Sequence, residues 1–364
     1  MSTNKPYILG MKRLLLLTLV LFTCMIVLLS CATTEKPKEE IKVEEVKLSN
    51  NKTAIKLIRN PSRGYNYDGY IYIPPLTTLD SATHLLVIPN NSGKNGDISF
   101  QDAKVREVIK SNSWETIIAA GIRCPLFIPV FPRDGEGPYY HDMTYEAITS
   151  VGMGRRIDIQ LVNMIKDVLE YLDSRFELSD KVLLAGASAS GDFVSRFTVL
   201  HPEIVQAMVT GLNSGIPMAP ATRYKSTPLE YPFGVFNFRS ITGKSFNLEA
   251  FKEINILSMN GNLDEDSTHY FDGHSNIYPM TKDDILSTYG DTIRKRCETT
   301  FEIFSKYTER FQSLLYENEG HHLVVQDAIT FLNKNKGEEF VPITPSKPVV
   351  YNKNTANIAS NPNQ

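Results

Sequence analysis

Residues 181–193 read Lys-Val-Leu-Leu-Ala-Gly-Ala-Ser-Ala-Ser-Gly-Asp-Phe, and this stretch decides the fold that we expect. An apolar run passes through small residues directly into a helical pattern, which predicts a buried strand turning sharply into a helix. Such a turn brings together the residues two before and two after its central residue, so both must be small. Gly186 and Ser190 flank Ser188 in this way.

A serine on a strained strand-to-helix turn is typical of a nucleophile elbow, and Ser188 is the predicted nucleophile. Ser190 is the alternative. Its own flanking residues would be Ser188 and Asp192, and an aspartate is bulky and wrongly charged beside a developing oxyanion. A helix N-terminus rich in small residues, without a catalytic role, would explain the same sequence. An enzyme therefore also requires a base and an acid elsewhere in the chain.

The predicted acid is Asp264. Where an elbow of this kind carries a catalytic serine, the acid and then the base follow it along the chain, on loops after later strands. Asp264 stands three residues beyond Gly261, at the carboxyl end of the apolar run 254–259. Asp266 is the nearby alternative, and an exposed acidic loop without a catalytic role would also explain both.

The predicted base is His321, which follows the next apolar run and precedes the helical pattern 323–332. Its neighbour His322 is a rival, and Gly320 directly before His321 favours the first of the pair. The other histidines either precede the acid or follow it within the same loop. A polar helix start is the simpler explanation of the doublet.

Two backbone amides would have to hold the oxyanion of a tetrahedral intermediate. The amide of Ala189, directly after the nucleophile, is the first candidate. The second is expected in the loop after an early strand, at Asn91, with Ser92 close behind. Ordinary turn chemistry would also account for that loop.

Short β-rich apolar runs alternate with helical patterns, which predicts an α/β fold with a mostly parallel sheet flanked by helices. The stripe of apolar residues between 157 and 175 predicts a packed helix. Strands are expected at 70–73, 84–88, 125–131, 181–185, 207–210, 254–259 and 313–316.

The N-terminus carries a secretion signal. Lys12 and Arg13 precede an uncharged apolar run that ends in Ser30-Cys31, which predicts a lipoprotein signal peptide at 1–30 and lipidation of Cys31. A plain transmembrane anchor is the alternative interpretation, and Cys24 is a weaker lipidation site. The expected location is therefore the cell envelope, outside the cytoplasm, with the membrane reached through a lipid anchor.

Three further segments follow the signal. Residues 31–51 are charged and poor in large apolar residues, so a flexible linker is expected. The catalytic domain is predicted to span 52–343, and the Pro- and Asn-rich segment 344–364 to be a disordered tail. Residues 133–149, rich in aromatics and turn formers, either line the substrate cleft or pack locally as a surface loop.

Composition limits the possible partners. The 364 residues include 42% hydrophobic and 22% charged ones, as in a globular protein. Removal of residues 1–30 takes three of 38 basic residues and no acidic one, leaving 35 against 41 and a net charge of −6. Nucleic acid is therefore not an expected partner. Cys124 and Cys297 remain, and two buried unpaired thiols are the simpler expectation, although a disulfide is chemically permitted in an exported protein.

The domain resembles a bacterial α/β-hydrolase family of secreted esterases related to polyhydroxyalkanoate depolymerases. The resemblance covers most of 52–343 and implies the same triad, Ser188, Asp264 and His321. This chain departs from the pattern where Ser190 replaces the usual glycine of the elbow, and in its doubled histidine. The segments that carry the resemblance are Arg156-Ile-Asp-Ile-Gln, Gly186-Ala-Ser-Ala-Ser-Gly, Arg196-Phe and Leu200-His-Pro-Glu, with shorter matches at 130–133, 231–235 and 261–264.

The resemblance implies hydrolysis of a small or polymeric carboxylic ester through an acyl-enzyme, without a metal or an organic cofactor. A serine peptidase is one alternative, since the same triad cleaves amides. A surface-binding lipoprotein that has lost catalysis on a hydrolase scaffold is another.

Overall fold

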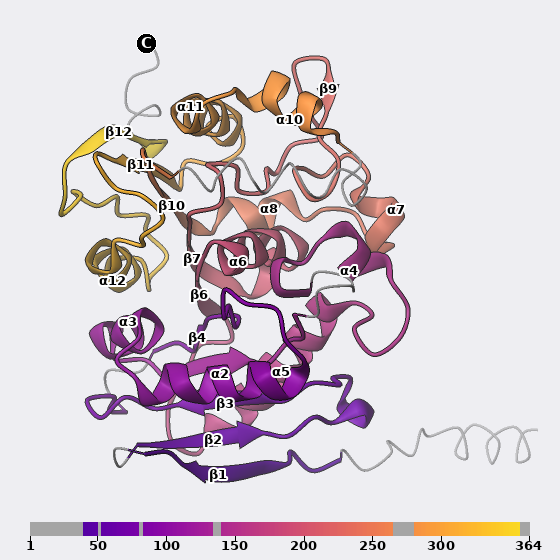
Figure 1. The fold of residues 1–364 in the computed structure, drawn as a ribbon, viewed down its shortest axis with the longest axis vertical. Coiled ribbons are helices and arrows are strands. Elements are labelled where there is room, and N and C mark those ends of the chain that lie inside the picture. Colours follow the sequence, from indigo (N-terminus) through magenta and orange to yellow (C-terminus); the bar gives the residue numbers. More distant parts are fainter. Residues whose placement is uncertain (1–38, 50–51, 80–82, 134–139, 265–279, 357–364) are drawn as a thin grey trace, which may run out of the picture. The chain divides into compact units, whose positions relative to one another are not determined.

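A ten-stranded sheet forms the centre of the unit that begins at Ile41 (Figure 1). The computed structural model describes residues 39–49, 52–79, 83–133, 140–264 and 280–356. Spatially the strands are ordered β1-β2-β3-β5-β4-β6-β7-β10-β11-β12. Their bounds are β1 Val43–Lys47, β2 Thr53–Leu57, β3 Gly69–Tyr72, β4 Leu86–Val87, β5 Leu126–Pro129, β6 Val182–Ala187, β7 Val205–Gly211, β10 Asn255–Gly261, β11 Phe311–Tyr316 and β12 Val349–Asn354.

The six strands from β5 to β11 in this spatial order are parallel, and the strands at both ends of the sheet are antiparallel. In the sheet β5 lies between β3 and β4, so these strands do not follow their order along the chain, and β3 is antiparallel to β5. This is the strand order of the α/β-hydrolase fold. The predicted fold class is therefore confirmed, and each of the seven predicted strands overlaps an observed one. A separate two-stranded ribbon joins β8 Arg223–Tyr224 to β9 Thr227–Pro228.

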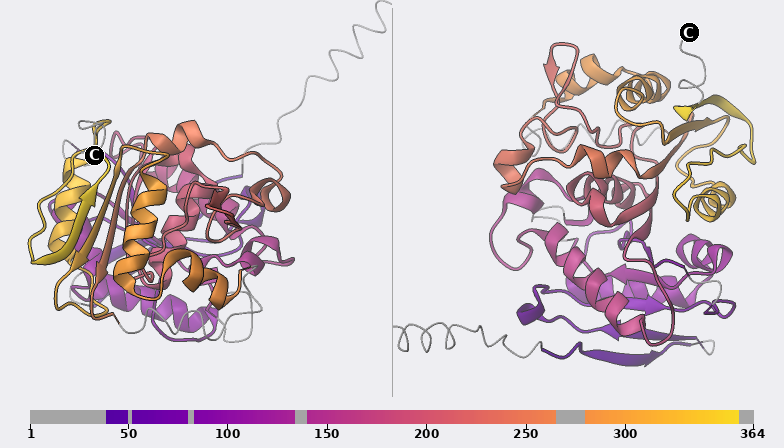
Figure 2. Two further views of the ribbon diagram at one scale, coloured as in Figure 1. Left: turned by 90° about the horizontal axis from the view of Figure 1, so that it is seen from above. Right: turned by 180° about the vertical axis from the view of Figure 1, so that it is seen from behind.

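Helices cover both faces of the sheet (Figure 2). Successive side chains of a strand point to opposite faces, so in β6 Val182 and Leu184 join one core cluster while Leu183 and Ala185 join the other. Helices α5, α6, α8 and α11 contribute to the first cluster, and α2, α3 and α12 to the second. The α-helices run over α2 Ile98–Lys110, α3 Trp114–Ile122, α4 Tyr145–Thr149, α5 Ile157–Leu172, α6 Ala189–Leu200, α7 Phe238–Thr242, α8 Leu248–Lys252, α10 Lys282–Tyr289, α11 Ile293–Phe304 and α12 Val325–Lys334.

Three short 3₁₀ helices, η1 Pro61–Arg63, η2 Tyr140–Asp142 and η3 Pro202–Ile204, complete the described elements. Between 140 and 149 the chain packs locally: Tyr140 and Tyr145 lie against the first core cluster and Met143 is fully buried. This matches the local-packing interpretation of the aromatic segment for residues 140–149.

The prediction that the linker 31–51 and the tail 344–364 do not pack was wrong in part. Residues 43–47, assigned to the linker, form β1 and pair antiparallel with β2, and 349–354, assigned to the tail, form β12 and pair with β11. Both are edge strands, which gain backbone hydrogen bonds on one side and tolerate polar side chains. The charged residues of β1 and the asparagines of β12 therefore hid the strand pattern in the sequence. Val43, Val46 and Tyr351 are nevertheless partly buried.

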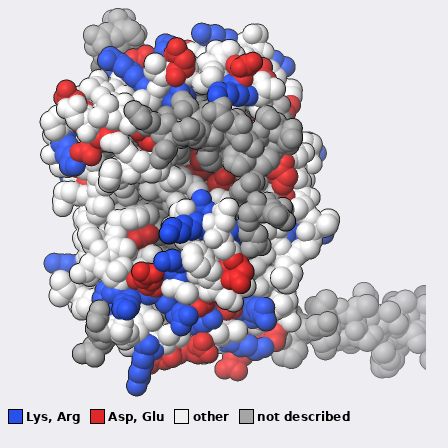
Figure 3. All heavy atoms as spheres, viewed as in Figure 1, with Lys and Arg blue, Asp and Glu red and all other residues white. Residues whose placement is uncertain are grey.

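The predicted signal peptide and the lipidation candidates Cys24 and Cys31 lie outside the described residues. No helix within the described ranges is both long and apolar enough to cross a membrane. Lysine and arginine side chains are interspersed with acidic ones over the face seen in Figure 3.

A buried histidine makes the stability of this fold depend on pH. His84, two residues before β4, is 6% exposed, and burial, with a contribution from the charge of Lys336, lowers its pKa from 6.5 to about 4. Between pH 6.5 and 4 the unfolded chain binds a proton here that the folded chain does not. As the pH is lowered from 6.5 to 4, the free energy of unfolding should therefore decrease by up to about 3 kcal/mol.

Urea unfolding of the His84→Gln variant should show a correspondingly weaker loss of stability between pH 6.5 and 4 than the unmodified chain. The matched control is His322→Gln, which replaces an exposed histidine. Equal pH slopes for the unmodified chain and His84→Gln would contradict this assignment.

Candidate active site

Ser188 lies between β6 and α6 with φ 58° and ψ −130°. This left-handed backbone region is strained for a residue with a Cβ, and such strain is concentrated at functional sites. The amide of Ser188 donates to the carbonyl of Gly211 at the end of β7, at 2.9 Å, which anchors the turn to the neighbouring strand. The predicted elbow is therefore present, and Ser188 is its central residue.

The small residues around the elbow are required by close backbone contacts. A Cβ on Gly186 would lie 2.1 Å from the carbonyl oxygen of Ser190, and one on Gly191 would lie 2.5 Å from that of Gly211. Real Cβ atoms do not approach a backbone oxygen so closely. Glycine is thus the residue that fits at position 186 without moving the helix.

Ser190 takes a structural part in the turn. Its side chain is fully buried, and its hydroxyl donates to the carbonyl of Ala187 at 2.8 Å while accepting from the amide of Ala187 at 3.0 Å. Both bonds are made within the elbow. The alternative nucleophile is therefore occupied with holding the strand-to-helix junction.

Asp264 and His321 meet after β10 and β11. The Nδ1 atom of His321 lies 2.9 Å and 3.1 Å from the two carboxylate oxygens of Asp264. The carboxylate is fully buried, whereas the imidazole is 33% exposed. A shielded carboxylate thus holds a partly exposed imidazole. The alternative acid Asp266 lies outside the described residues.

Two backbone hydrogen bonds hold the acid loop against the base loop. The amide of Asn262 donates to the carbonyl of Tyr316 at 3.0 Å, and that of Leu263 donates to the carbonyl of Glu319 at 2.8 Å. Gly261 permits this contact, since a Cβ there would lie 2.3 Å from the carbonyl oxygen of Glu319.

Ser188 and His321 line the same pocket, which has a volume of about 660 Å³. Since the pocket lies where parallel strands end, residues that follow β4, β5, β6, β7 and β11 converge on it, as open α/β sheets favour. The other described residues that line it are Asn91, Ser92, Gly93, Trp114, Arg133, Ala187, Leu212, His322 and Leu323.

The two predicted oxyanion residues have different surroundings. Ala189 is the first residue of α6, where the amides of the first turn have no partner within the helix. Asn91 lines the pocket, and its side-chain amide donates to the carbonyl of Ala187 at 3.1 Å. The loop after β4 is therefore tied directly to the elbow. Ser92 bonds within its own loop, donating to the carbonyl of Lys94 at 2.7 Å.

His322 also lines the pocket and is exposed. Its amide donates to the carbonyl of Gly320 at 2.8 Å, which turns the chain after His321. Of the two adjacent histidines, His321 is the one that the structure pairs with Asp264.

Sequence reasoning included Arg133 in the segment 133–149 that could line the cleft, and Arg133 does line the pocket, but it did not assign Trp114 or Leu212 to it. Leu212 lies two residues beyond the region 207–210 that was predicted as a strand, so its position along the chain could have indicated it. Trp114 opens α3 and reaches the site only through the packing of that helix, and no local sequence signal marks it.

Neither of the two cysteines that the structure describes lines the pocket. Cys124 and Cys297 are free and buried, as expected for unpaired thiols. Burial raises the pKa of Cys297 to about 12, so this thiol stays protonated near neutral pH. In the part of the chain that the structure describes, no cluster of three His, Cys, Asp or Glu side chains could hold a metal ion.

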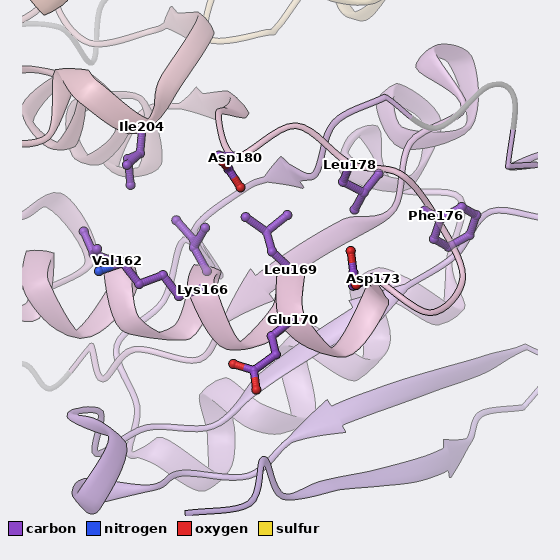
Figure 4. A pocket seen from close by; sticks show the side chains of 10 residues that line it. Val162, Lys166, Leu169, Glu170, Asp173, Phe176, Leu178, Asp180 and Ile204 are labelled. Carbon is purple, nitrogen blue, oxygen red and sulfur yellow. The ribbon is translucent and has the colours of Figure 1, made fainter. Parts of the chain in front are cut away.

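A second pocket, of about 410 Å³, lies along α5 and the loop that follows it (Figure 4). Apolar side chains such as Leu169, Phe176 and Ile204 contribute to it, with Lys166 and Glu170 among its charged residues. None of its described lining residues is a serine, cysteine or histidine. It therefore lacks the residue types predicted as nucleophile and base, which the first pocket contains.

Comparison of the sequence finds no matching protein family and no matching curated protein. Similar solved structures include poly(aspartic acid) hydrolase-1 from Sphingomonas sp. KT-1, at 15% identity over 80% of this chain and 98% of that one, with a TM-score of 0.49. The poly(3-hydroxybutyrate) depolymerase LpqC from Bordetella parapertussis shares 15% identity over 82% and 90%, with a TM-score of 0.46.

An S-formylglutathione hydrolase from Agrobacterium tumefaciens shares 10% identity over 82% of this chain and 100% of that one, also with a TM-score of 0.46. These likenesses concern the fold. The assignment of the site rests on the geometry of this chain.

Replacing Gly261 with alanine should destabilise the fold by about 2 kcal/mol or more, because the new Cβ would overlap the backbone carbonyls of Glu319 and Gly320. The measurement is the free energy of unfolding in urea. Gly320→Ala is the matched control, since a Cβ there meets its nearest atom at an ordinary 3.8 Å. Equal stabilities of the two variants would contradict the packing described.

Proposed function

We propose that this protein is a serine hydrolase that cleaves carboxylic esters through an acyl-enzyme. Ser188 is the nucleophile, His321 the general base and acid, and Asp264 the carboxylate that orients His321. The observation that carries the proposal is the Asp264–His321 hydrogen bond beside a pocket that His321 shares with a strained serine.

Each residue type matches its step. His321 takes the proton of the Ser188 hydroxyl as the serine oxygen attacks the ester carbonyl, and then returns it to the leaving alcohol. Water, activated by the same histidine, releases the acid from the serine. Nδ1 of His321 faces Asp264, so Nε2 is the ring nitrogen that we assign to this proton transfer.

The oxyanion of each tetrahedral intermediate would be held by the backbone amides of Ala189 and Asn91. Support comes from the position of Ala189 at the start of α6 and from the side-chain bond that ties Asn91 to Ala187. That bond fixes the Asn91 loop relative to the serine, as a preorganised oxyanion site requires.

Replacement of the triad residues should abolish turnover of a short-chain 4-nitrophenyl ester. Ser188→Ala should also remove covalent labelling by a fluorophosphonate, because the reactive hydroxyl is gone. His321→Gln should lower kcat by about three orders of magnitude or more, since no base then accepts the serine proton. The measurements are release of 4-nitrophenolate and gel detection of the labelled protein.

Ser190→Ala and His322→Gln are the matched controls. The former should still be labelled, and the latter should lose far less activity than His321→Gln. Circular dichroism confirms that each variant is folded. Labelling that survives in Ser188→Ala would remove this serine from the mechanism, and an unlabelled, folded parent protein would favour a binding function over catalysis.

We further propose that residues 1–30 are removed on export and that Cys31 carries the lipid anchor. The support is the basic pair Lys12 and Arg13, the apolar run and the Ser30-Cys31 junction. The anchored enzyme would act in the cell envelope, outside the cytoplasm.

In a bacterial host that processes lipoproteins, Cys31→Ser should either shift the protein from the membrane fraction to the soluble fraction or leave the signal peptide uncleaved. Metabolic labelling with a palmitate analogue should be lost at the same time. Cys24→Ser is the matched control and should keep both properties. Lipid labelling that persists in Cys31→Ser would contradict the assignment.

A further inference from the structure

Leu212 directly follows β7 and adopts a backbone conformation that leucine rarely takes. Its φ is 55°, in the left-handed region, which is unusual for a residue with a bulky side chain. Gly211, the residue before it, is paired with Ala187 in the sheet and accepts a hydrogen bond from the amide of Ser188 at 2.9 Å. Ser188 and Leu212, both with positive φ, therefore follow directly on paired residues of β6 and β7, and both line the pocket.

The packing of the hydrophobic core does not account for this conformation. Leu212 is 7% exposed, yet it belongs to neither of the two core clusters that the described residues form. Its amide donates to the carbonyl of Met259 in β10 at 3.0 Å, which ties the residue to the sheet. Backbone strain that core packing does not explain points to a function, and the feature that Leu212 helps to form is the wall of the pocket.

Side chains of α11 hold the turn that begins with Leu212. The Nε atom of Arg296 donates to the carbonyl of Ser214 at 2.7 Å, and the hydroxyl of Thr300 donates to the carbonyl of Gly215 at 2.8 Å. Both hydrogen bonds are buried. The turn is thus fixed from outside the pocket, and a side chain that is held in place can discriminate substrates by their size.

The surface beside Leu212 is apolar. A Cβ on Gly211 would lie 3.4 Å from Cδ1 of Leu323, so the side chain of Leu323 packs against the backbone directly before Leu212. Leu323 lines the pocket as well. The loop that carries Asn91 follows β4, and β6 lies between β4 and β7 in the sheet. Leu212 therefore follows the strand on the far side of β6 from the loop of the proposed oxyanion donor.

We infer that Leu212 sets the acyl specificity of the site, admitting esters of short acyl groups and excluding those of long ones. This inference rests on the proposed function, because it names the substrate class of that same site. With the oxyanion directed toward the Asn91 loop and the leaving alcohol beside His321, the acyl group extends toward β7 and meets Leu212. In a pocket closed by a fixed apolar side chain, one methylene too many lowers kcat/KM by about tenfold or more.

Two pairs of esters test the inference. The acyl pair is 4-nitrophenyl acetate and 4-nitrophenyl hexanoate, which share their alcohol. The alcohol pair is ethyl acetate and hexyl acetate, which share their acyl group. The measurement is kcat/KM, from release of 4-nitrophenolate for the first pair and from titration of the released acid for the second. The parent protein should favour 4-nitrophenyl acetate over the hexanoate by about tenfold or more.

Leu212→Ala should raise the hexanoate-to-acetate ratio of kcat/KM by about tenfold, because it removes the atoms that close the pocket, and Leu212→Phe should lower this ratio. The ratio is taken within one variant, so a general loss of activity cancels. The ratio for the alcohol pair should stay that of the parent. Leu169→Ala, which removes the same atoms from the second pocket, is the matched control and should keep both ratios. Since glycine suits a positive φ, Leu212→Gly enlarges the pocket in the same way if the alanine variant does not fold.

Equal or higher kcat/KM of the parent protein for the hexanoate, or an acyl ratio that is unchanged in the folded Leu212 variants, would overturn the inference while leaving the esterase proposal intact. A change confined to the alcohol pair would overturn it as well, because Leu212 would then contact the leaving group. Absence of turnover of all four esters by the parent protein would contradict the proposed function itself and the inference with it.

Discussion

The close approach of two backbone segments, after β10 and after β11, is the constraint on which the site depends. Gly261 lets the chain that leads to Asp264 lie against Glu319 and Gly320, and the amides of Asn262 and Leu263 bond across the gap. A buried carboxylate is unfavourable unless it is paired. The contact between these loops places the imidazole of His321 beside the carboxylate of Asp264. The parallel order of the strands then brings the pair to the edge where Ser188 stands.

The elbow shows how a departure from the usual glycine is accommodated. Ser190 occupies the position two residues after the nucleophile, and its hydroxyl bonds to both backbone groups of Ala187. The side chain that could have obstructed the turn thereby satisfies a buried donor and acceptor, which are unfavourable when unpaired. The close contact falls instead on Gly186, where no side chain exists to obstruct it.

Sequence patterns predicted the central part of the fold because parallel strands covered on both faces must be apolar on consecutive residues. They failed for β1 and β12, whose stability comes from backbone pairing at a sheet edge. The order along the chain was sufficient to select Ser188, Asp264 and His321 for comparison with the structure. Gly320 favoured His321 over His322, but the order along the chain alone does not decide between two neighbouring residues of an irregular loop, because their side chains differ only in direction. Trp114 reaches the pocket through helix packing, which the linear pattern does not encode.

The position of β1 has a mechanical consequence. The chain enters the sheet through an edge strand that pairs on one side with β2 alone, and β2 and β3 separate it from the parallel strands that carry the pocket. Tension applied through the N-terminal segment would act first on the five-residue β1–β2 ladder. Because β1 is not paired with β6, β10 or β11, loss of the β1–β2 pairing would leave in place the strands that precede Ser188, Asp264 and His321.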